Sequence, residues 1–299
     1  MPNARIRPTL LLLAAGAAVV GSLAACSPLT AINALSPAGG AEATTGIAYG
    51  SEPRLKLDIY RPATPAPGAP VVVFFYGGNW NSGERMDYAF VGRALASRGI
   101  VAVIPDYRLY PQVSYPDFLD DSAQAVAWAA NNIASYGGDP KSLFVMGHSA
   151  GAYNAAMVAL DGRWLGKQGA TPAILAGWIG LAGPYDFLPI ENENVKPVFH
   201  FPNTPSASQP VNHLDGKKLP TLLIAANNDK LVNPRRNTGG LAARLRGHGV
   251  PVTEVYYDGV THTTLVGSIA APLRGLAPTL DAIDKFVRNN ASLSKVQAM

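Results

Sequence analysis

The pentapeptide at residues 147–151, Gly-His-Ser-Ala-Gly, has the G-x-S-x-G pattern of a nucleophile turn. An apolar run at 142–146 predicts a strand directly before it, and the small residues of 150–160 predict a helix directly after it. A serine on such a sharp turn is held in strained backbone geometry that exposes its hydroxyl, and flanking glycines leave room for the helix. The sequence therefore predicts Ser149 as a reactive nucleophile.

With strand, turn and helix in this order, the chain resembles the α/β-hydrolase superfamily from residue 46 to residue 287. A serine hydroxyl needs a base to remove its proton and an acid to orient the base, in the chain order Ser, Asp or Glu, His. Asp229, in AANNDKLVNP after an apolar run, resembles the acid loop of the superfamily. His262, in YYDGVTHTTL, resembles its G-x-x-H-x-x-L loop. The resemblance implies a catalytic triad of Ser149, Asp229 and His262.

Residues 76–80, Tyr-Gly-Gly-Asn-Trp, resemble the His-Gly-Gly-Gly-Trp oxyanion motif of hormone-sensitive-lipase-like esterases. Two positions depart from that motif, because tyrosine replaces histidine and Asn79 replaces the third glycine. The chemistry requires backbone N–H groups that point at the oxygen on which negative charge develops. The resemblance implies that Gly78 and Asn79 donate such groups, together with Ala150 after the nucleophile.

Two further segments are shared with particular branches of the superfamily. Tyr-Gly-Gly-Asp-Pro at 136–140 resembles the segment before the nucleophile strand in arylformamidases and prenylcysteine methylesterases. Pro-Asp-Tyr-Arg at 105–108 is similar to a stretch in these esterases and in bacterial feruloyl-esterase-like domains. We interpret the second segment as architectural rather than catalytic.

Other side chains compete for the roles of acid and base. His148 adjoins Ser149, but consecutive side chains on such a turn point in different directions, so we interpret it as a packing or hydrogen-bonding residue. Asp186, in GPYDF, is a rival acid, because some hydrolases place the carboxylate after this strand. Three more histidines fall in polar loops or in a loop-rich insertion, and we expect them to be solvated: His200, His213 and His248.

The elements that must position these residues alternate between short apolar runs and helix-like stretches. This alternation predicts an α/β fold with an eight-stranded, mostly parallel sheet and helices on both faces. The strands are expected at 46–49, 55–60, 71–76, 100–104, 142–146, 174–181, 222–226 and 252–257. The helices are expected at 88–98, 117–136, 150–160, 241–246 and 280–287. The first two strands are expected to form an antiparallel hairpin, and residues 184–219 a small lid-like insertion.

Composition excludes several classes of protein. The chain has 299 residues, of which 48% are hydrophobic and 15% charged, so it can bury a large core and is not disordered. One cysteine cannot form an intramolecular disulfide or a thiolate metal cluster. The net charge of +4 is small and the basic residues are not clustered, so no nucleic-acid partner is expected.

The first 25 residues have the pattern of a secretory signal peptide. Arg5 and Arg7 precede an apolar run, and Leu-Ala-Ala-Cys at 23–26 resembles the bacterial lipoprotein cleavage box. The resemblance implies that Cys26 becomes the lipidated first residue and anchors the protein to a membrane of the cell envelope. An uncleaved anchor and an ordinary secretory peptide are the alternatives. Residues 26–45 are expected to be a flexible tether, and 46–299 the catalytic domain.

Together, these patterns predict a serine hydrolase that cleaves carboxylic esters of short acyl or aryl groups through an acyl-enzyme. No cofactor and no metal is expected, because the base and the oxyanion hole supply the catalysis. The alternatives are an arylformamidase-like amide hydrolase and, with less support, a surface-tethered binding protein without activity. The expected partners are a small ester substrate and the membrane, and the oligomeric state is left open.

Overall fold

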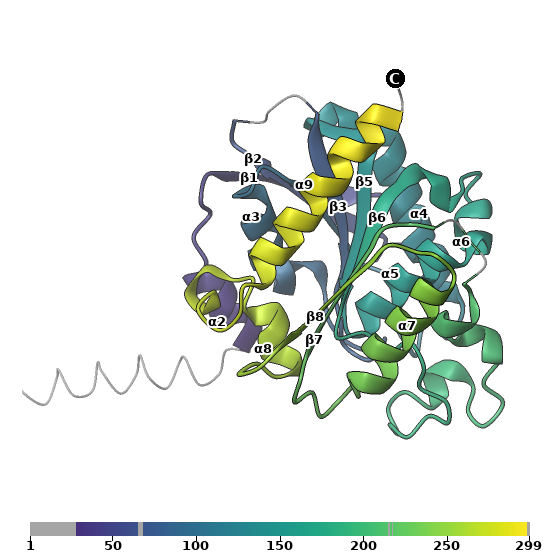
Figure 1. The fold of residues 1–299 in the computed structure, drawn as a ribbon. Coiled ribbons are helices and arrows are strands. Elements are labelled where there is room, and N and C mark those ends of the chain that lie inside the picture. Colours follow the sequence, from purple (N-terminus) through teal and green to yellow (C-terminus); the bar gives the residue numbers. More distant parts are fainter. Residues whose placement is uncertain (1–27, 65–67, 215, 217, 298–299) are drawn as a thin grey trace, which may run out of the picture.

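A single eight-stranded sheet forms the centre of the protein in the computed structural model, which describes residues 28–64, 68–214, 216 and 218–297 (Figure 1). The strand order across the sheet is β1-β2-β4-β3-β5-β6-β7-β8. The strands are β1 (Ala41–Ala48), β2 (Lys56–Pro62), β3 (Ala69–Phe75), β4 (Val101–Pro105), β5 (Gly138–His148), β6 (Leu175–Leu181), β7 (Thr221–Ala226) and β8 (Val252–Tyr257). The predicted α/β class and the eight strands are confirmed.

Strand direction divides the sheet into two parts. β1 pairs with β2, and β2 with β4, in antiparallel fashion, whereas β4, β3, β5, β6, β7 and β8 are parallel. The central strands β3 and β5 carry nearly continuous runs of fully buried apolar residues, as expected for strands covered on both faces. The loops after β3, β5 and β7 therefore emerge at the same edge of the sheet, where the predicted site residues lie.

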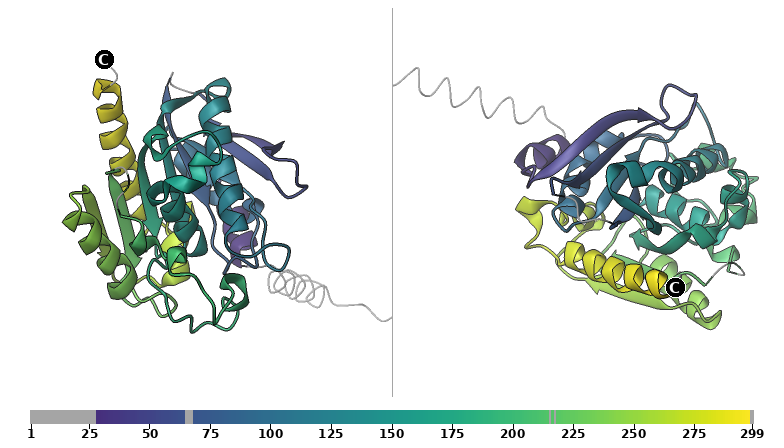
Figure 2. Two further views of the ribbon diagram at one scale, coloured as in Figure 1. Left: turned by 90° about the vertical axis from the view of Figure 1, so that its right-hand side faces the viewer. Right: turned by 90° about the horizontal axis from the view of Figure 1, so that it is seen from above.

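Helices cover both faces of the sheet (Figure 2). On one face α3 and α9 contact each other, and on the other α4, α5 and α6 pack together. The helices are α2 (Pro28–Leu35), α3 (Ala89–Ala96), α4 (Asp117–Asn132), α5 (Ala150–Leu160), α6 (Gly162–Gly166), α7 (Gly240–Gly247), α8 (His262–Gly267) and α9 (Thr279–Gln297). The sequence patterns located α3, α4, α5, α7 and the start of α9, but not α2, α6 or α8.

Helix α4 shows why the sequence patterns succeeded. Asp117 and Asp120 lie in its first turn, where they complement the helix dipole, and Phe118 and Leu119 are fully buried. A short 3₁₀ turn follows and ends at Gly137, whose φ of 84° is left-handed. Amphipathic spacing and terminal residues therefore agree on the same boundaries.

The predicted flexible tether over 26–45 is wrong for the part that the structure describes. Residues 28–35 form α2, and β1 begins at Ala41. The Asn33 side chain fastens α2 to the body, because its Nδ2 donates to the carbonyl of Met86 and its Oδ1 accepts from the N–H of Phe90, both at 2.9 Å. Small residues resembled a linker by composition, but tertiary contacts order them.

The loop-rich stretch 184–219 lies between β6 and β7, as expected. Where it is described it contains three short 3₁₀ turns: Pro197–Phe199, Ser206–Ser208 and Pro210–Asn212. Phe199 is fully buried, and the Tyr153 hydroxyl donates to the Ser208 carbonyl at 2.8 Å. Much of the insertion is therefore packed onto the body.

The predicted signal peptide and Cys26 lie outside the described residues. Among the helices of the described ranges, none is both long enough and apolar enough to cross a bilayer.

Candidate active site

Ser149 occupies the tight turn that the sequence predicted. β5 ends at His148, α5 begins at Ala150, and Ser149 has φ 55° and ψ −123°, a strained conformation for a residue other than glycine. The helix passes so close that a Cβ on Gly151 would lie 2.0 Å from the carbonyl oxygen of Phe75. Only glycine fits there, because a side chain would collide with the backbone of β3.

Asp229 and His262 meet although they are far apart in the sequence. Asp229 lies in the loop after β7, and its Oδ2 is 2.7 Å from Nδ1 of His262, the first residue of α8. Both side chains are almost entirely buried. A reciprocal capping box between Thr261 and Thr264 begins α8 and sets the direction in which the histidine leaves the backbone.

The carboxylate of Asp229 is held in its ionised form. Burial acts to raise its pKa, but hydrogen bonds from His262 and from the N–H groups of Val232 and Leu231 outweigh burial and lower the pKa below its usual value. An ionised carboxylate only accepts hydrogen bonds, so the hydrogen of neutral His262 resides on Nδ1. Nε2 of His262 is then the basic nitrogen.

His148 has the hydrogen-bonding and packing position that the sequence suggested. Its Nε2 lies 2.9 Å from the carbonyl oxygen of His262, to which it donates, and its ring centroid is 4.9 Å from that of His262. Burial and the neighbouring His262 lower the pKa of His148 to about 3. His148 is therefore neutral and braces the backbone of His262.

The rival acid Asp186 lies elsewhere in the site. Its Oδ1 is 3.1 Å from Nη2 of Arg236, and its N–H donates to Oδ1 of Asn237 at 2.9 Å. The expectation of solvated histidines holds only in part, because His213 is part-buried with its Nδ1 3.8 Å from Asp161. The only carboxylate hydrogen-bonded to His262 in the described chain belongs to Asp229.

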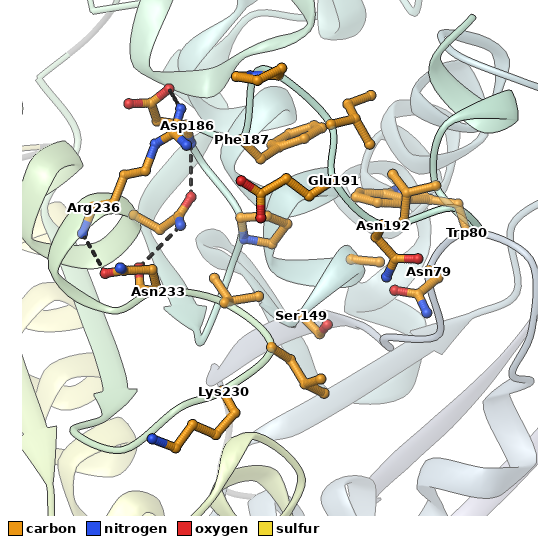
Figure 3. Close-up of a pocket in the computed structure, with 18 residues that line it drawn as sticks. Asn79, Trp80, Ser149, Asp186, Phe187, Glu191, Asn192, Lys230, Asn233 and Arg236 are labelled. Atoms are coloured by element: carbon orange, nitrogen blue, oxygen red, sulfur yellow. Dashed lines mark hydrogen bonds and ion pairs between the residues drawn. The ribbon is translucent and has the colours of Figure 1, made fainter. Parts of the chain in front are cut away.

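The loop after β3 brings two of the predicted oxyanion donors to Ser149. Gly78, Asn79 and Trp80 have φ of 127°, 52° and 58°, three left-handed residues in succession. A Cβ on Gly78 would lie 2.3 Å from the carbonyl oxygen of Ser82, so this turn requires glycine. Asn79, Ala150 and Ser149 line the same cavity (Figure 3). Within the described ranges, the N–H groups of Asn79 and Ala150 donate no backbone hydrogen bond and are available to a ligand.

Asn154 is a site-supporting residue that the sequence analysis missed. It is fully buried in α5, and its Oδ1 accepts from Nε1 of Trp80 at 2.9 Å. This bond connects the loop after β3 to the helix that follows Ser149. The available signal was a polar residue within an otherwise small and apolar helix.

The cavity has a volume of about 420 Å³ and is lined by apolar and charged residues (Figure 3). The aromatic residues of this lining are Trp80 and Phe187. Tyr185 and Phe199 are buried in the core instead, and Phe201 is largely exposed. Four charged residues also line the cavity, and the sequence analysis had considered only the first of them for the site: Asp186, Glu191, Lys230 and Arg236.

Comparisons with known proteins agree with this geometry. The model of the BD-FAE family matches residues 57–241, which is more than half of the chain. A probable isoprenylcysteine alpha-carbonyl methylesterase, ICMEL1 of Oryza sativa subsp. japonica, is 31% identical over 77% of this chain and 58% of its own length. Esterase LipQ of Mycobacterium tuberculosis is 32% identical over 69% of this chain and 53% of its own length. The chain thus spans between half and two thirds of these curated relatives.

Among solved structures, esterase B from Lactobacillus rhamnosis, inhibited by a tributyrin phosphonate, has a TM-score of 0.76. At 19% identity, with 98% of each chain covered, it shows that the fold is shared. The strand order, the nucleophile turn at the end of β5 and the matching family model lead to one assignment. This chain belongs to the BD-FAE family and has the α/β-hydrolase fold.

Proposed function

We propose that this protein is a serine esterase that hydrolyses carboxylic esters through an acyl-enzyme. The observation that carries the proposal is the buried hydrogen bond between Asp229 and His262, formed at the edge of the sheet where Ser149 faces the cavity. The esterase names of the relatives in rice and Mycobacterium tuberculosis support the same reaction.

In this mechanism Ser149 Oγ attacks the ester carbonyl while His262 Nε2 takes the hydroxyl proton. Asp229 holds the imidazole in the tautomer that makes Nε2 basic, and it stabilises the imidazolium that forms. His262 then gives the proton to the leaving alcohol. Water attacks the acyl-enzyme by the reverse sequence of proton transfers and releases the acid.

The oxyanion of each tetrahedral intermediate is proposed to accept backbone N–H bonds from the loop after β3 and from Ala150. Asn79 and Ala150 border the cavity beside Ser149, which supports their role as donors. Gly78, the third predicted donor, occupies the tight turn that presents Asn79. Removing one such donor costs about 2.7 to 4 kcal/mol of transition-state stabilisation in a comparable enzyme.

The substrate class proposed is esters with a short acyl or an aryl group. A cavity of about 420 Å³ bordered by Trp80 and Phe187 has room for a small apolar group. The remaining border mixes polar residues such as Asn192 and Asn233 with apolar ones such as Ile190, so the volume of the cavity, rather than its polarity, would limit the length of an alkyl chain. No observation favours an amide over an ester.

Steady-state hydrolysis of p-nitrophenyl acetate, butyrate and octanoate by the purified chain tests the proposal, beside Ser149→Ala and an aryl formamide. We expect ester hydrolysis that falls with chain length and disappears in Ser149→Ala. Hydrolysis of the formamide alone would transfer the assignment to amide hydrolysis. A folded protein with no activity on either class would leave the binding role as the better description.

We further propose that Cys26 is lipidated and anchors the protein at a cell envelope. The support is the sequence pattern before Cys26. Expression with a radiolabelled fatty acid tests this, with Cys26→Ser as the control. We expect label and membrane association in the parent chain and neither in Cys26→Ser. Equal membrane association of the two chains would contradict lipidation.

A further inference from the structure

The loop at 77–83 needs support from outside itself. It carries predicted oxyanion donors, and its residues Gly78, Asn79 and Trp80 all have left-handed φ. Residues other than glycine pay a conformational penalty there, so such a loop keeps its shape only when the surrounding structure holds it. The Trp80–Asn154 bond fixes the middle of the loop, which leaves the question of what fixes its two ends.

The start of the loop is fixed through Tyr76, the tyrosine that replaces the histidine of the resembling motif. Its ring is fully buried, and its hydroxyl donates to Oδ1 of Asp106 at 2.9 Å and accepts from Nη2 of Arg54 at 3.1 Å. The hydroxyl of Tyr107 donates to the carbonyl oxygen of Tyr76 at 2.8 Å. Both the side chain and the backbone of Tyr76 are thereby held.

The end of the loop is fixed by the same two charged residues. Nη2 of Arg54 donates to the carbonyl oxygen of Gly83 at 2.6 Å. Oδ1 of Asp106 accepts from the backbone N–H of Arg85 at 2.7 Å, and Oδ2 of Asp106 pairs with the Arg85 guanidinium. The carboxyl side chain of Asp106 is only 5% exposed, so these bonds lie in a poorly screened environment.

We propose that Arg54, Tyr76 and Asp106 form a clamp that closes the two ends of the loop 77–83 and so positions its oxyanion donors. The three residues are positioning residues and do not touch the substrate. Arg54 and Asp106 each bond both to Tyr76, before the loop, and to Gly83 or Arg85, at its far end. The Pro-Asp-Tyr-Arg segment at 105–108 supplies Asp106 to the clamp and would therefore help to position the loop 77–83. This inference rests on the proposed esterase function.

The sharpest variant is Tyr76→Phe, which removes one oxygen and keeps the ring. We expect kcat on p-nitrophenyl acetate to fall about tenfold, with KM changed by less than about twofold, because displaced donors weaken transition-state binding and leave ground-state binding intact. Tyr60→Phe is the matched control, because Tyr60 is a buried tyrosine on β2 outside the clamp. It should keep the parent kcat.

Arg54 allows a rescue experiment. Arg54→Met removes the bonds to both ends of the loop, and we expect kcat to fall about 100-fold. Arg54→Lys retains one cationic donor and should recover part of that loss. Each variant is compared with the parent at a temperature well below its melting transition, so that the folded fraction is the same. Hydrogen–deuterium exchange of a peptide covering 77–84 should quicken in Tyr76→Phe and Arg54→Met but not in Tyr60→Phe.

Labelling of Ser149 by a fluorophosphonate separates this inference from the proposed function. Phosphonylation uses the same oxyanion donors but needs no ester turnover, so its rate should fall in parallel with kcat. A parent chain that labels but hydrolyses no ester contradicts the proposed substrate class, and the labelling rates still test the clamp. Unchanged labelling and kcat in folded Tyr76→Phe and Arg54→Met would overturn the clamp, as would a loss confined to KM. A parent chain that does not label would overturn it too.

Discussion

The floor and the roof of the cavity are built in different ways. The floor consists of residues 76–80 and 147–151. Its glycines let backbone segments approach each other closely, and buried hydrogen bonds such as Trp80–Asn154 hold it in place. The roof consists of residues 184–195, where Glu191 and Asn192 are exposed at the cavity border. The Glu191 carboxylate makes no ion pair in the part of the chain that is described.

The difference between floor and roof suggests that the floor carries out the reaction and that the roof affects which substrate is preferred. Donors and nucleophile must be held closely to a required geometry, and the floor achieves this through backbone conformations that few residues permit. Exposed side chains on the roof can change at little cost to stability, since surface substitutions usually shift it by less than about 0.5 kcal/mol. Substitutions in the floor and its acid–base pair should therefore affect turnover, and those in the roof should affect the choice of substrate.

The largest effect is expected for Ser149→Ala, which removes the proposed nucleophile from the floor of the cavity. Turnover of p-nitrophenyl butyrate should fall about 10⁶-fold, to the level that binding and the oxyanion donors alone supply. The melting temperature should stay near that of the parent, or rise, because alanine has no hydroxyl to hold in place. Residual activity above about 1% would show that another residue is the nucleophile.

Asp229→Asn should have the next largest effect. The amide cannot hold His262 in the productive tautomer, and the corresponding change in a comparable triad lowers kcat about 10⁴-fold. Asp186→Asn is the matched control at the cavity border and should retain most of the activity. If Asp186→Asn were the more damaging change, Asp186 would be the acid of the triad.

His148, which lies in the floor, should make the free energy of unfolding of the protein depend on pH. Its pKa is about 3 in the folded protein against a usual 6.5, so between these values the unfolded chain binds a proton that the folded chain does not. The contribution of His148 to the free energy of unfolding is fully present above pH 6.5. It is lost as the pH falls toward 3, at about 1.4 kcal/mol per pH unit.

Urea unfolding between pH 7 and 4 measures this slope. His148→Gln, which keeps a donor toward the carbonyl of His262, should flatten it. The exposed histidine His248 provides the control, and His248→Gln should leave the slope as it is. Equal slopes in the parent and in His148→Gln would contradict a buried neutral His148.

Glu191→Gln should have the smallest effect and should act on selection alone. The unpaired carboxylate of the roof attracts cationic groups and repels anionic ones, so the variant should lose about two- to fivefold in kcat/KM for a cationic ester. Its kcat/KM should rise for an anionic ester and stay unchanged for a neutral one. The differences should shrink in 0.5 M salt, and a uniform loss on all three esters would place Glu191 among the residues that support the chemistry.

The local patterns were sufficient where neighbours in sequence are also neighbours in space. The turn at Ser149 lies between β5 and α5, which are its neighbours in sequence, and the glycines that it requires are visible in the sequence. Apolar runs located β2 and the six parallel strands, because parallel strands in the centre of a sheet are buried on both faces and have few polar residues. Only the last three residues of the largely exposed edge strand β1 fell within a predicted strand. Asp229 and His262 were identified by the order of the family motifs along the chain. The sequence alone does not show that the two residues are close in space.

Composition misled where tertiary contacts decided. The small residues at 28–45 have the character of a linker, yet Asn33 bonds α2 to residues more than fifty positions away.

The sequence by itself determined the strand-turn-helix around Ser149, the order of the elements and therefore the fold class. Only the tertiary structure decided that Asp229, rather than Asp186, bonds His262, that His148 braces the backbone of His262, and that Arg54 and Asp106 bridge the ends of the loop 77–83. The physical reason is that hydrophobic periodicity and turn residues act over a few positions along the chain. Buried polar groups need hydrogen-bond partners, and these partners can come from any part of the folded chain. The spacing of residues along the sequence does not predict such long-range contacts.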